Sequence, residues 1–352
     1  MTALTRRHLL AGSPLLAARL PRRVRVAVIG LQGHPNEVIG PLDQLPDVEL
    51  VAIADRSEAE IAKVRKNPRA AAARAYPDYR VMLDREKPDV VGVCNAADER
   101  APAVLECSQR GLHWIAEKPL ANSRAELEAI RKALAANPRI RFSMLLPMRF
   151  DSPYLALKAL CASGEIGEVA QISSQKSYKW RTQPEWKKHF KSYGGTLPWI
   201  GSHMVDLMRW TSGREFTEVF TYQGQVGGFP EIGEMENTTG SVFRMDNGGV
   251  ATLHMDFLRP EISPTHGDDR LRLAGTKGVA EYLAATGVTI VSEGRKPEVI
   301  RKLPDKRSVF VDFLESVYNG AAPGLSSRDI FRTCEIVLAA RESAELSRAV
   351  KL

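Results

Sequence analysis

Cysteine is scarce in this sequence, and long apolar runs are missing. The four cysteines, Cys94, Cys107, Cys161 and Cys334, are widely separated, and neither a CxxC pair nor a His/Cys cluster at metal-ligand spacing occurs. A disulfide framework and a structural zinc site are therefore not expected, and no other metal site is predicted. Beyond the N-terminal residues, no segment approaches the roughly 20 consecutive apolar residues that span a bilayer, so membrane insertion is not expected.

A basic segment that could follow a nucleic-acid backbone is also absent. The formal net charge is +7, but six of the 49 Lys and Arg residues precede the first acidic residue, which leaves 43 basic and 42 acidic residues in the rest of the chain. No long Lys/Arg run remains to follow a phosphate backbone, so nucleic-acid binding is not expected. With 352 residues, 44% of them hydrophobic, the chain is long enough for two globular domains.

Residues 1–21 differ in character from the rest of the chain. Arg6 and Arg7 are followed by a short apolar region, and the small residues Ala17 and Ala18 stand near its end. This pattern resembles a twin-arginine export signal, which would carry an already folded protein, with its cofactor, to the periplasm. Because the apolar region is short and the cleavage site is poor, a frayed N-terminus on a cytoplasmic protein is the alternative.

The pattern that follows predicts a dinucleotide-binding fold. A β-branched run at residues 24–29 ends at Gly30, a helical segment reaches about Leu45, and a second strand at residues 48–54 ends at Asp55. The first glycine permits a tight turn, amides at the helix start attract pyrophosphate, and the acid can accept both ribose hydroxyls.

The glycine turn departs from the usual GxGxxG pattern. Gln32 and Pro35 stand where the second and third glycines would be, although Gly33 can relieve the crowding one residue later. A phosphate-free turn between strand and helix is therefore the alternative interpretation. The candidate cofactor-binding residues in this region are Gly30, Gln32, Gly33, His34, Asp55 and Arg56.

Two of these residues bear on which dinucleotide binds. The carboxylate of Asp55 would repel a 2′-phosphate, which favours NAD. Arg56 follows immediately and could pair with that phosphate, so NADP remains open.

Further strand and helix units complete a doubly wound parallel sheet over residues 22–146. One predicted strand ends before Asn95, which should face the cofactor side, and the next ends in Glu117-Lys118-Pro119. Ligands bind outside the carboxyl ends of such strands, so Lys118 is placed to meet a cofactor and a substrate. The alternative is a surface ion pair before a turn. The expected helices here are residues 57–66, 79–84, 101–111 and 123–136, and the later strands are residues 89–94, 114–116 and 140–144.

Residues 147–352 predict a second domain of the α+β class. Hairpin signals such as Asp246-Asn247-Gly248-Gly249 separate alternating strands, which indicates a large, mostly antiparallel open sheet. The expected strands are residues 170–178, 218–226, 239–245, 250–257, 269–274 and 279–282, and the expected helices are residues 154–163, 309–318 and 327–347.

One segment of this domain carries a candidate proton acceptor. His203 and Asp206 are three residues apart, and Trp199 lies one turn earlier, so all three share a helical face if the segment is helical. A histidine can accept a proton near neutral pH, and a nearby carboxylate can orient it. A purely structural histidine is the alternative.

Five segments in this order resemble the Gfo/Idh/MocA family of NAD(P)-dependent oxidoreductases, from Val24 to Leu352. They are the glycine turn with Asp55, Glu117-Lys118-Pro119, and residues 163–169, 194–206 and 275–278. The resemblance implies a Rossmann domain, a substrate-binding and oligomerisation domain, and a sugar or polyol-like substrate. Family members commonly associate through the open faces of their second-domain sheets, which implies a homo-oligomer, a dimer or a tetramer.

The same resemblance implies the catalytic residues, Lys118 and His203. His203 would accept the proton of a substrate hydroxyl while hydride passes to the nicotinamide, and Lys118 would position that oxygen and stabilise its charge. Asn95, Glu117 and Lys118 join the expected cofactor-binding residues. The expected substrate-binding residues are Lys118, Arg149, Tyr178, Trp199, His203 and Asp206. Lys179, Arg181 and His189 also lie in segments expected near the substrate. For these three, and for Arg149 and Tyr178, a solvated surface position is the alternative.

One departure from the family bears on activity. The family commonly has an aspartate four residues before the histidine, and here that residue is Trp199. An indole cannot transfer a proton, but it can stack on a sugar or on the nicotinamide, or simply pack in the core. Two alternatives to a dehydrogenase therefore remain: a glycosidase or lyase that uses tightly held NAD for a transient oxidation, and a nucleotide-binding protein without catalysis.

Overall fold

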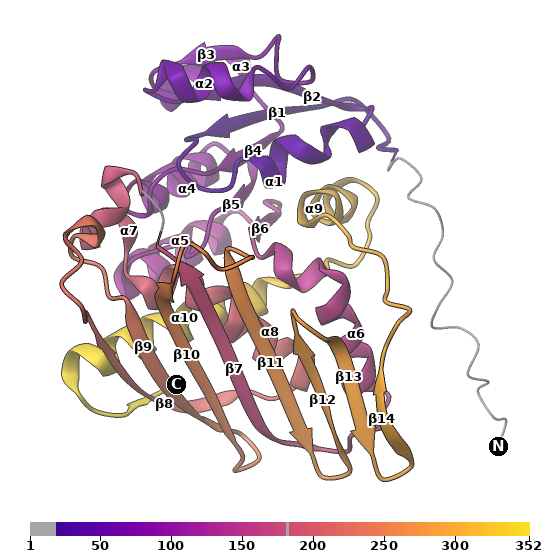
Figure 1. Cartoon of the computed structure of the whole chain (residues 1–352). Coiled ribbons are helices and arrows are strands. Elements are labelled where there is room, and N and C mark those ends of the chain that lie inside the picture. Colours follow the sequence, from indigo (N-terminus) through magenta and orange to yellow (C-terminus); the bar gives the residue numbers. More distant parts are fainter. Residues whose placement is uncertain (1–18, 181–182) are drawn as a thin grey trace, which may run out of the picture.

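The computed structural model describes residues 19–180 and 183–352 (Figure 1). The expected export signal lies almost entirely outside this range, and so does Arg181. In the described part of the chain, no helix combines the length and the apolar character needed to cross a membrane.

The first sheet has six parallel strands in the order β3-β2-β1-β4-β5-β6. This is the strand order of the Rossmann fold, which confirms the predicted doubly wound sheet. Its strands are β1 (Val24–Ile29), β2 (Val48–Ala54), β3 (Arg74–Tyr76), β4 (Val90–Val93), β5 (His113–Ala116) and β6 (Phe142–Met144). Its helices are α1 (Asn36–Ile39), α2 (Glu58–Val64), α3 (Tyr79–Glu86), α4 (Ala97–Gln109) and α5 (Arg124–Ala136).

The helix after the glycine turn is shorter than expected. Instead of one helix to Leu45, α1 covers a single turn and continues as a 3-10 helix, Gly40–Gln44. Pro41 explains the change, since its ring and its missing N–H prevent an α-helix from continuing through it.

The second sheet has nine strands in the order β14-β13-β12-β11-β7-β10-β9-β8-β15. One neighbouring pair, β7 and β10, is parallel, and the others are antiparallel, which confirms the predicted sheet. The strands are β7 (Val169–Lys179), β8 (Phe216–Gly224), β9 (Thr238–Met245), β10 (Val250–Arg259), β11 (Gly267–Gly275), β12 (Gly278–Leu283), β13 (Gly287–Ser292), β14 (Arg295–Val299) and β15 (Val350–Lys351). Neither β14 nor β15 was predicted, because short, exposed edge strands leave little apolar pattern. The inner strand β13 was not predicted either, although its Val288 and Ile290 alternate and are buried.

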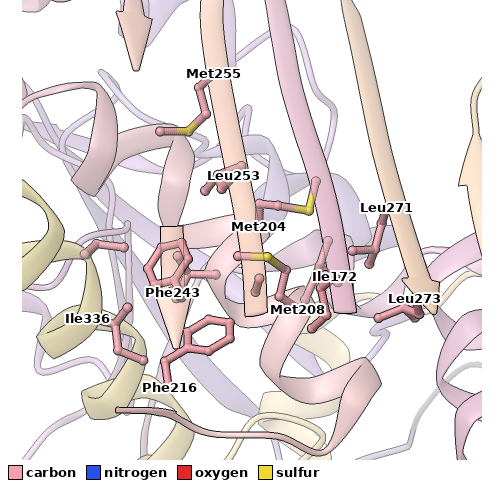
Figure 2. Packing of buried hydrophobic residues seen from close by; sticks show 14 of the residues in the cluster. Ile172, Met204, Met208, Phe216, Phe243, Leu253, Met255, Leu271, Leu273 and Ile336 are labelled. Atoms are coloured by element: carbon pink, nitrogen blue, oxygen red, sulfur yellow. The ribbon is translucent and has the colours of Figure 1, made fainter. Parts of the chain in front are cut away.

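Helices cover one face of this sheet and leave the other open (Figure 1). The covering helices are α6 (Ser152–Ala162), α8 (Ser202–Ser212) and α10 (Ser327–Leu346). Met204 and Met208 of α8 lie against strand residues such as Ile172 and Leu253 (Figure 2), and all four side chains are buried. This packing fixes the position of α8, which carries His203.

The C-terminal helices also pack against the first domain. Phe310 and Leu314 of α9 (Val309–Tyr318) belong to the core on one side of the Rossmann sheet, and Ile330 and Cys334 of α10 belong to the core on its other side. The shorter helical segments are α7 (Phe190–Tyr193), 3-10 turns at Pro147–Phe150, Glu185–Lys188 and Pro230–Ile232, and a π-helical turn at Leu197–Gly201.

Candidate active site

The glycine turn lies directly on the carboxyl ends of β4 and β5. Gly30 has a φ of 75°, and a Cβ at this position would lie 2.5 Å from Cβ of Asn95. Gly33 donates its N–H to the carbonyl of Cys94 at 2.8 Å, and a Cβ there would lie 2.5 Å from Cγ of Glu117. Both positions therefore require glycine, and Gly33 allows the turn to approach Glu117 closely.

Asp55 ties this turn to the end of β2. One carboxylate oxygen accepts hydrogen bonds from the backbone N–H of Leu31 and from Nε2 of Gln32, both at 2.8 Å. The other accepts from the N–H of Ser57 at 2.7 Å. Gln32, which replaces a motif glycine, thus turns its side chain toward the acid that is expected to bind ribose.

A cavity of about 720 Å³ opens beside the turn, in the size range of cofactor sites. Its lining includes Gly30, Gln32, Asp55, Arg56 and Asn95. The buried oxygens Gln32 Oε1 and Asn95 Oδ1 have no hydrogen-bond partner within the described residues. A glycine cradle, an acid at the end of the second strand and two unpaired polar atoms fit a dinucleotide, and these residues would hold it. Arg56 borders this cavity, but its side chain lies mostly in solvent, with Nη1 3.8 Å from Oε1 of Glu99.

Glu117 connects the glycine turn to Lys118. Its carboxylate accepts the backbone N–H of His34 at 2.6 Å and makes a second, shorter contact with Nδ1 of the His34 ring. Its other oxygen is 3.8 Å from Nζ of Lys118. Burial raises the pKa of Glu117, but the charges of His34, Lys118 and Arg100 outweigh it and hold this pKa well below its ordinary value.

Lys118 is almost completely buried, at 1% exposure, and follows the apolar strand β5. Burial lowers the pKa of Lys118 to about 7, assisted by Arg100, Lys187 and Lys176 and opposed by Glu117. Its ammonium therefore titrates in the neutral range, a property typical of functional lysines.

Trp199 lies at the centre of an aromatic cluster in the π-helical turn before α8. Nζ of Lys118 is 3.5 Å from the centroid of its ring, and the ring of His34 stacks on it at 6.1 Å. Trp186 and Tyr193 contact it at centroid distances of 5.3 and 5.2 Å. Trp199 is thus both a packed core residue and the cation–π partner of Lys118, a contact that favours the charged amine.

Because Trp199 is 5% exposed, replacing it with alanine should lower the free energy of unfolding by about 3–5 kcal/mol. The loss has two sources, the buried ring area and the cavity left among its aromatic neighbours. Chemical denaturation followed by circular dichroism measures the change. Trp199→Phe keeps much of the packing, so its free energy of unfolding should fall by less than half as much as that of Trp199→Ala. A cost below about 1 kcal/mol for the alanine variant would contradict this assignment to the core.

His203 lies in the first turn of α8, and its buried Nδ1 has no hydrogen-bond partner among the described residues. Burial, followed by the positive charges of Lys118 and Lys176, lowers the pKa of His203 well below its ordinary value. The imidazole is therefore neutral near pH 7 and can accept a proton.

The structure gives Asp206 and Arg149 a different place from the one expected. Arg149 Nε donates to Asp206 at 2.9 Å, and a second, shorter hydrogen bond joins its Nη2 to the other carboxylate oxygen. Both side chains are buried, and Arg149 Nη1 also binds Asp329 and the carbonyl of Gly324, each at 3.0 Å. Asp206 thus neutralises a buried guanidinium that joins the Pro147–Phe150 turn to α8 and α10, rather than orienting His203.

Lys118, Tyr178, Trp199 and His203 meet on a second cavity of about 210 Å³, together with His34. Arg149, Asp206 and His189 are not in its lining, and His189 pairs with Glu185 at 3.2 Å near the surface. Sequence reasoning missed seven other lining residues: Trp180, Lys187, Gln183, Tyr193, Ile200, Phe257 and His266. The alternation of basic and aromatic residues from position 176 to 187 was the available signal for the first two. Within the described ranges, no cluster of His, Cys, Asp or Glu could hold a metal ion.

Relatives share both domains of this chain. The family model for oxidoreductases with an NAD-binding Rossmann fold matches residues 24–144, and the GFO/IDH/MocA C-terminal domain matches residues 154–281. Myo-inositol 2-dehydrogenase of Thermotoga maritima is 26% identical over 94% of this chain and 98% of its own length. Inositol 2-dehydrogenase of Salmonella typhimurium is 25% identical, but over 55% of this chain and 57% of its own length.

Solved structures agree with this relationship. The structure of a putative oxidoreductase from Thermotoga maritima has a TM-score of 0.87 and 30% identity, and covers 94% of this chain and 100% of its own. A levoglucosan dehydrogenase in complex with NADH shares the fold, with a TM-score of 0.80 at 18% identity, over 94% of this chain and 99% of its own. With both family domains present over a matching fold, the chain belongs to the Gfo/Idh/MocA family of NAD-binding oxidoreductases.

Proposed function

We propose that this protein is an NAD-dependent dehydrogenase that acts on a CH–OH group of a sugar or polyol. The observation that carries the proposal is that Lys118 and His203 meet on one small cavity beside the glycine turn, where Nδ1 of His203 has no hydrogen-bond partner among the described residues. The named activity of the Thermotoga maritima relative, a polyol dehydrogenase, supports the substrate class.

Each residue has a distinct role in this proposal. His203, neutral near pH 7, accepts the proton of the substrate hydroxyl, and the Lys118 ammonium holds that oxygen and stabilises its developing charge. Bound NAD supplies the hydride acceptor. The rings of Tyr178 and Phe257 line the cavity and offer apolar surface on which a sugar ring can pack.

Turnover assays with a panel of sugars and polyols test the proposal. Nicotinamide absorbance should change when the purified protein meets its substrate and NAD. Product formation without an absorbance change, combined with NAD(H) released on denaturation, would instead identify a glycosidase or lyase that oxidises and re-reduces one carbon. Absence of any bound or bindable nucleotide would overturn both enzyme proposals.

For the cofactor, we expect Asp55→Asn to raise the Kd of NAD by about tenfold. The ratio of the Kd for NADP to the Kd for NAD should become smaller. The carboxylate is the group expected to accept ribose hydroxyls and to repel a 2′-phosphate, and a charged hydrogen bond contributes roughly this factor. Calorimetric titration with both nucleotides measures the change. Glu49→Gln changes an exposed residue of β2, the strand that Asp55 follows, and is the matched control. If the ratio of the two Kd values is the same in Asp55→Asn as in the native protein, Asp55 does not contact the ribose.

We also propose that the protein is exported, on the strength of Arg6 and Arg7 and the apolar region after them. Replacing both arginines with lysine should retain the protein in the cytoplasm of its host, as measured by cell fractionation. Periplasmic recovery of that variant would contradict the proposed route.

For assembly, we propose a homo-oligomer joined through the open face of the second sheet. Tyr222, Val242 and Leu258 on β8, β9 and β10 are 69%, 50% and 50% exposed, an apolar surface typical of an interface. A solution mass equal to the 38.9 kDa of one chain would rule this assembly out.

A further inference from the structure

The smaller cavity carries an excess of positive charge. Its lining includes three lysines and three histidines but no aspartate or glutamate among the described residues. These six residues are Lys118, Lys179, Lys187, His34, His203 and His266. His203 is neutral near pH 7, and the carboxylate of Glu117 lies beside His34 and Lys118. Among the described residues, the positive charge without a counter-charge is therefore that of Lys179 and Lys187. A pocket that serves a neutral sugar has no need for this charge, because burying it costs free energy.

Two of the lysines lack a carboxylate partner in the described part of the chain. Lys179 is 6% exposed, and its Nζ donates to the backbone carbonyl of Glu261 at 2.7 Å. Lys187 Nζ donates to the side-chain amide oxygen of Gln183 at 2.9 Å, and burial lowers the pKa of Lys187. Nearby Lys176, by contrast, is paired with Asp269 at 3.0 Å.

The hydrogen-bonding groups of the pocket are also unbalanced. The indole Nε1 of Trp180 is buried without a hydrogen-bond partner among the described residues, and an indole N–H can only donate. Ammonium groups likewise only donate. A sugar hydroxyl both donates and accepts, whereas a carboxylate or phosphate group offers acceptors alone. The lysines and Trp180 therefore match an anionic group better than a neutral one.

We propose that the substrate is an anionic sugar, whose carboxylate or phosphate pairs with Lys179 and is further attracted by Lys187. The reacting hydroxyl then meets Lys118 and His203, and the sugar ring lies against Tyr178 and Phe257. This inference rests on the proposed dehydrogenase function and names its substrate class.

Matched substrates test the inference. With NAD, glucuronate or glucose 6-phosphate should be used with a kcat/KM at least about tenfold above that of glucose or myo-inositol, and the two anions distinguish carboxylate from phosphate. Lys179→Met should raise the KM for the preferred anion by about tenfold to a hundredfold with a smaller change in kcat, because one charged contact is lost. Added salt should raise the KM of the native protein for the anion, because it screens the contact with Lys179. Lys179→Met should leave the Kd of NAD unchanged.

Control variants separate charge from structure. Lys296→Met removes an exposed lysine of the edge strand β14 and should change neither KM nor the preference for the anion. Lys179→Arg keeps the positive charge and should retain the preference even if Lys179→Met folds poorly.

The outcomes separate the inference from the proposed function. Higher kcat/KM for neutral sugars, or an unchanged anion-to-neutral ratio in a folded Lys179→Met protein, would overturn the anionic substrate and leave the dehydrogenase intact. If no sugar is turned over, the dehydrogenase proposal fails. Quenching of tryptophan fluorescence by glucuronate in the NAD-loaded protein then still decides whether Lys179 binds an anion, and no difference between native protein and Lys179→Met would overturn that assignment too.

Discussion

Lys118→Met should lower kcat/KM by about a thousandfold and change the Kd of NAD by less than about threefold. The ammonium is the group that meets the developing negative charge on the substrate oxygen, so its loss acts mainly on the transition state. Methionine nearly matches the lysine in length and fits its buried, apolar position against Trp199. Steady-state kinetics and nucleotide titration measure the two effects separately.

The control for this variant is its stability. Lys118→Met removes a buried charge whose pKa burial already lowers to about 7, and Glu117 keeps His34 and Arg100 as positive neighbours. The melting temperature should therefore not fall by more than a few degrees. If the folded variant keeps more than a tenth of the native kcat/KM, Lys118 does not stabilise the reacting oxygen.

His203→Asn should lower kcat/KM by about a hundredfold to ten-thousandfold, because the reaction then lacks its proton acceptor. The pH profile identifies the role more directly than the loss of rate. Since burial and Lys118 lower the pKa of His203, the neutral imidazole persists to a pH below about 6.5, and activity should fall only below that point. The asparagine variant should lose this acid limb.

The opposite limb of the profile belongs to Lys118. Its pKa of about 7 means that the ammonium is present below this pH and is lost as the pH rises through it, so kcat/KM should decline on the alkaline side. Lys118→Met should abolish that decline in its residual activity. A kcat/KM that instead rises through pH 7 would show that the neutral amine of Lys118, rather than His203, accepts the proton.

Several features of the site were predictable because they depend on local sequence. Strands that end in Gly30, Asp55, Asn95 and Glu117 show the apolar runs and the polar stops of a parallel sheet. The carboxyl ends of neighbouring parallel strands share one edge, so predicting these strands also placed their terminal residues together. The sheet order confirms this reasoning.

The role of Asp206 was not predictable in the same way. Spacing along a helix places Asp206 and His203 on one face, but it carries no information about what approaches that face. Arg149, from a distant segment, donates two hydrogen bonds to the carboxylate of Asp206. The carboxylate is therefore not the group that orients His203. A buried guanidinium needs a counter-charge more than a neutral imidazole does, which decides the competition.

The sequence by itself determined the two-domain architecture, the glycine turn with its acid, and the candidates Lys118 and His203, because periodicity and strand ends are local properties of the chain. Tertiary structure alone decided that Trp199 packs on Lys118 and that Lys179 and Lys187 share a cavity with no acidic side chain among its described residues. These features depend on which side chains from separate segments converge, and on how burial changes their charges.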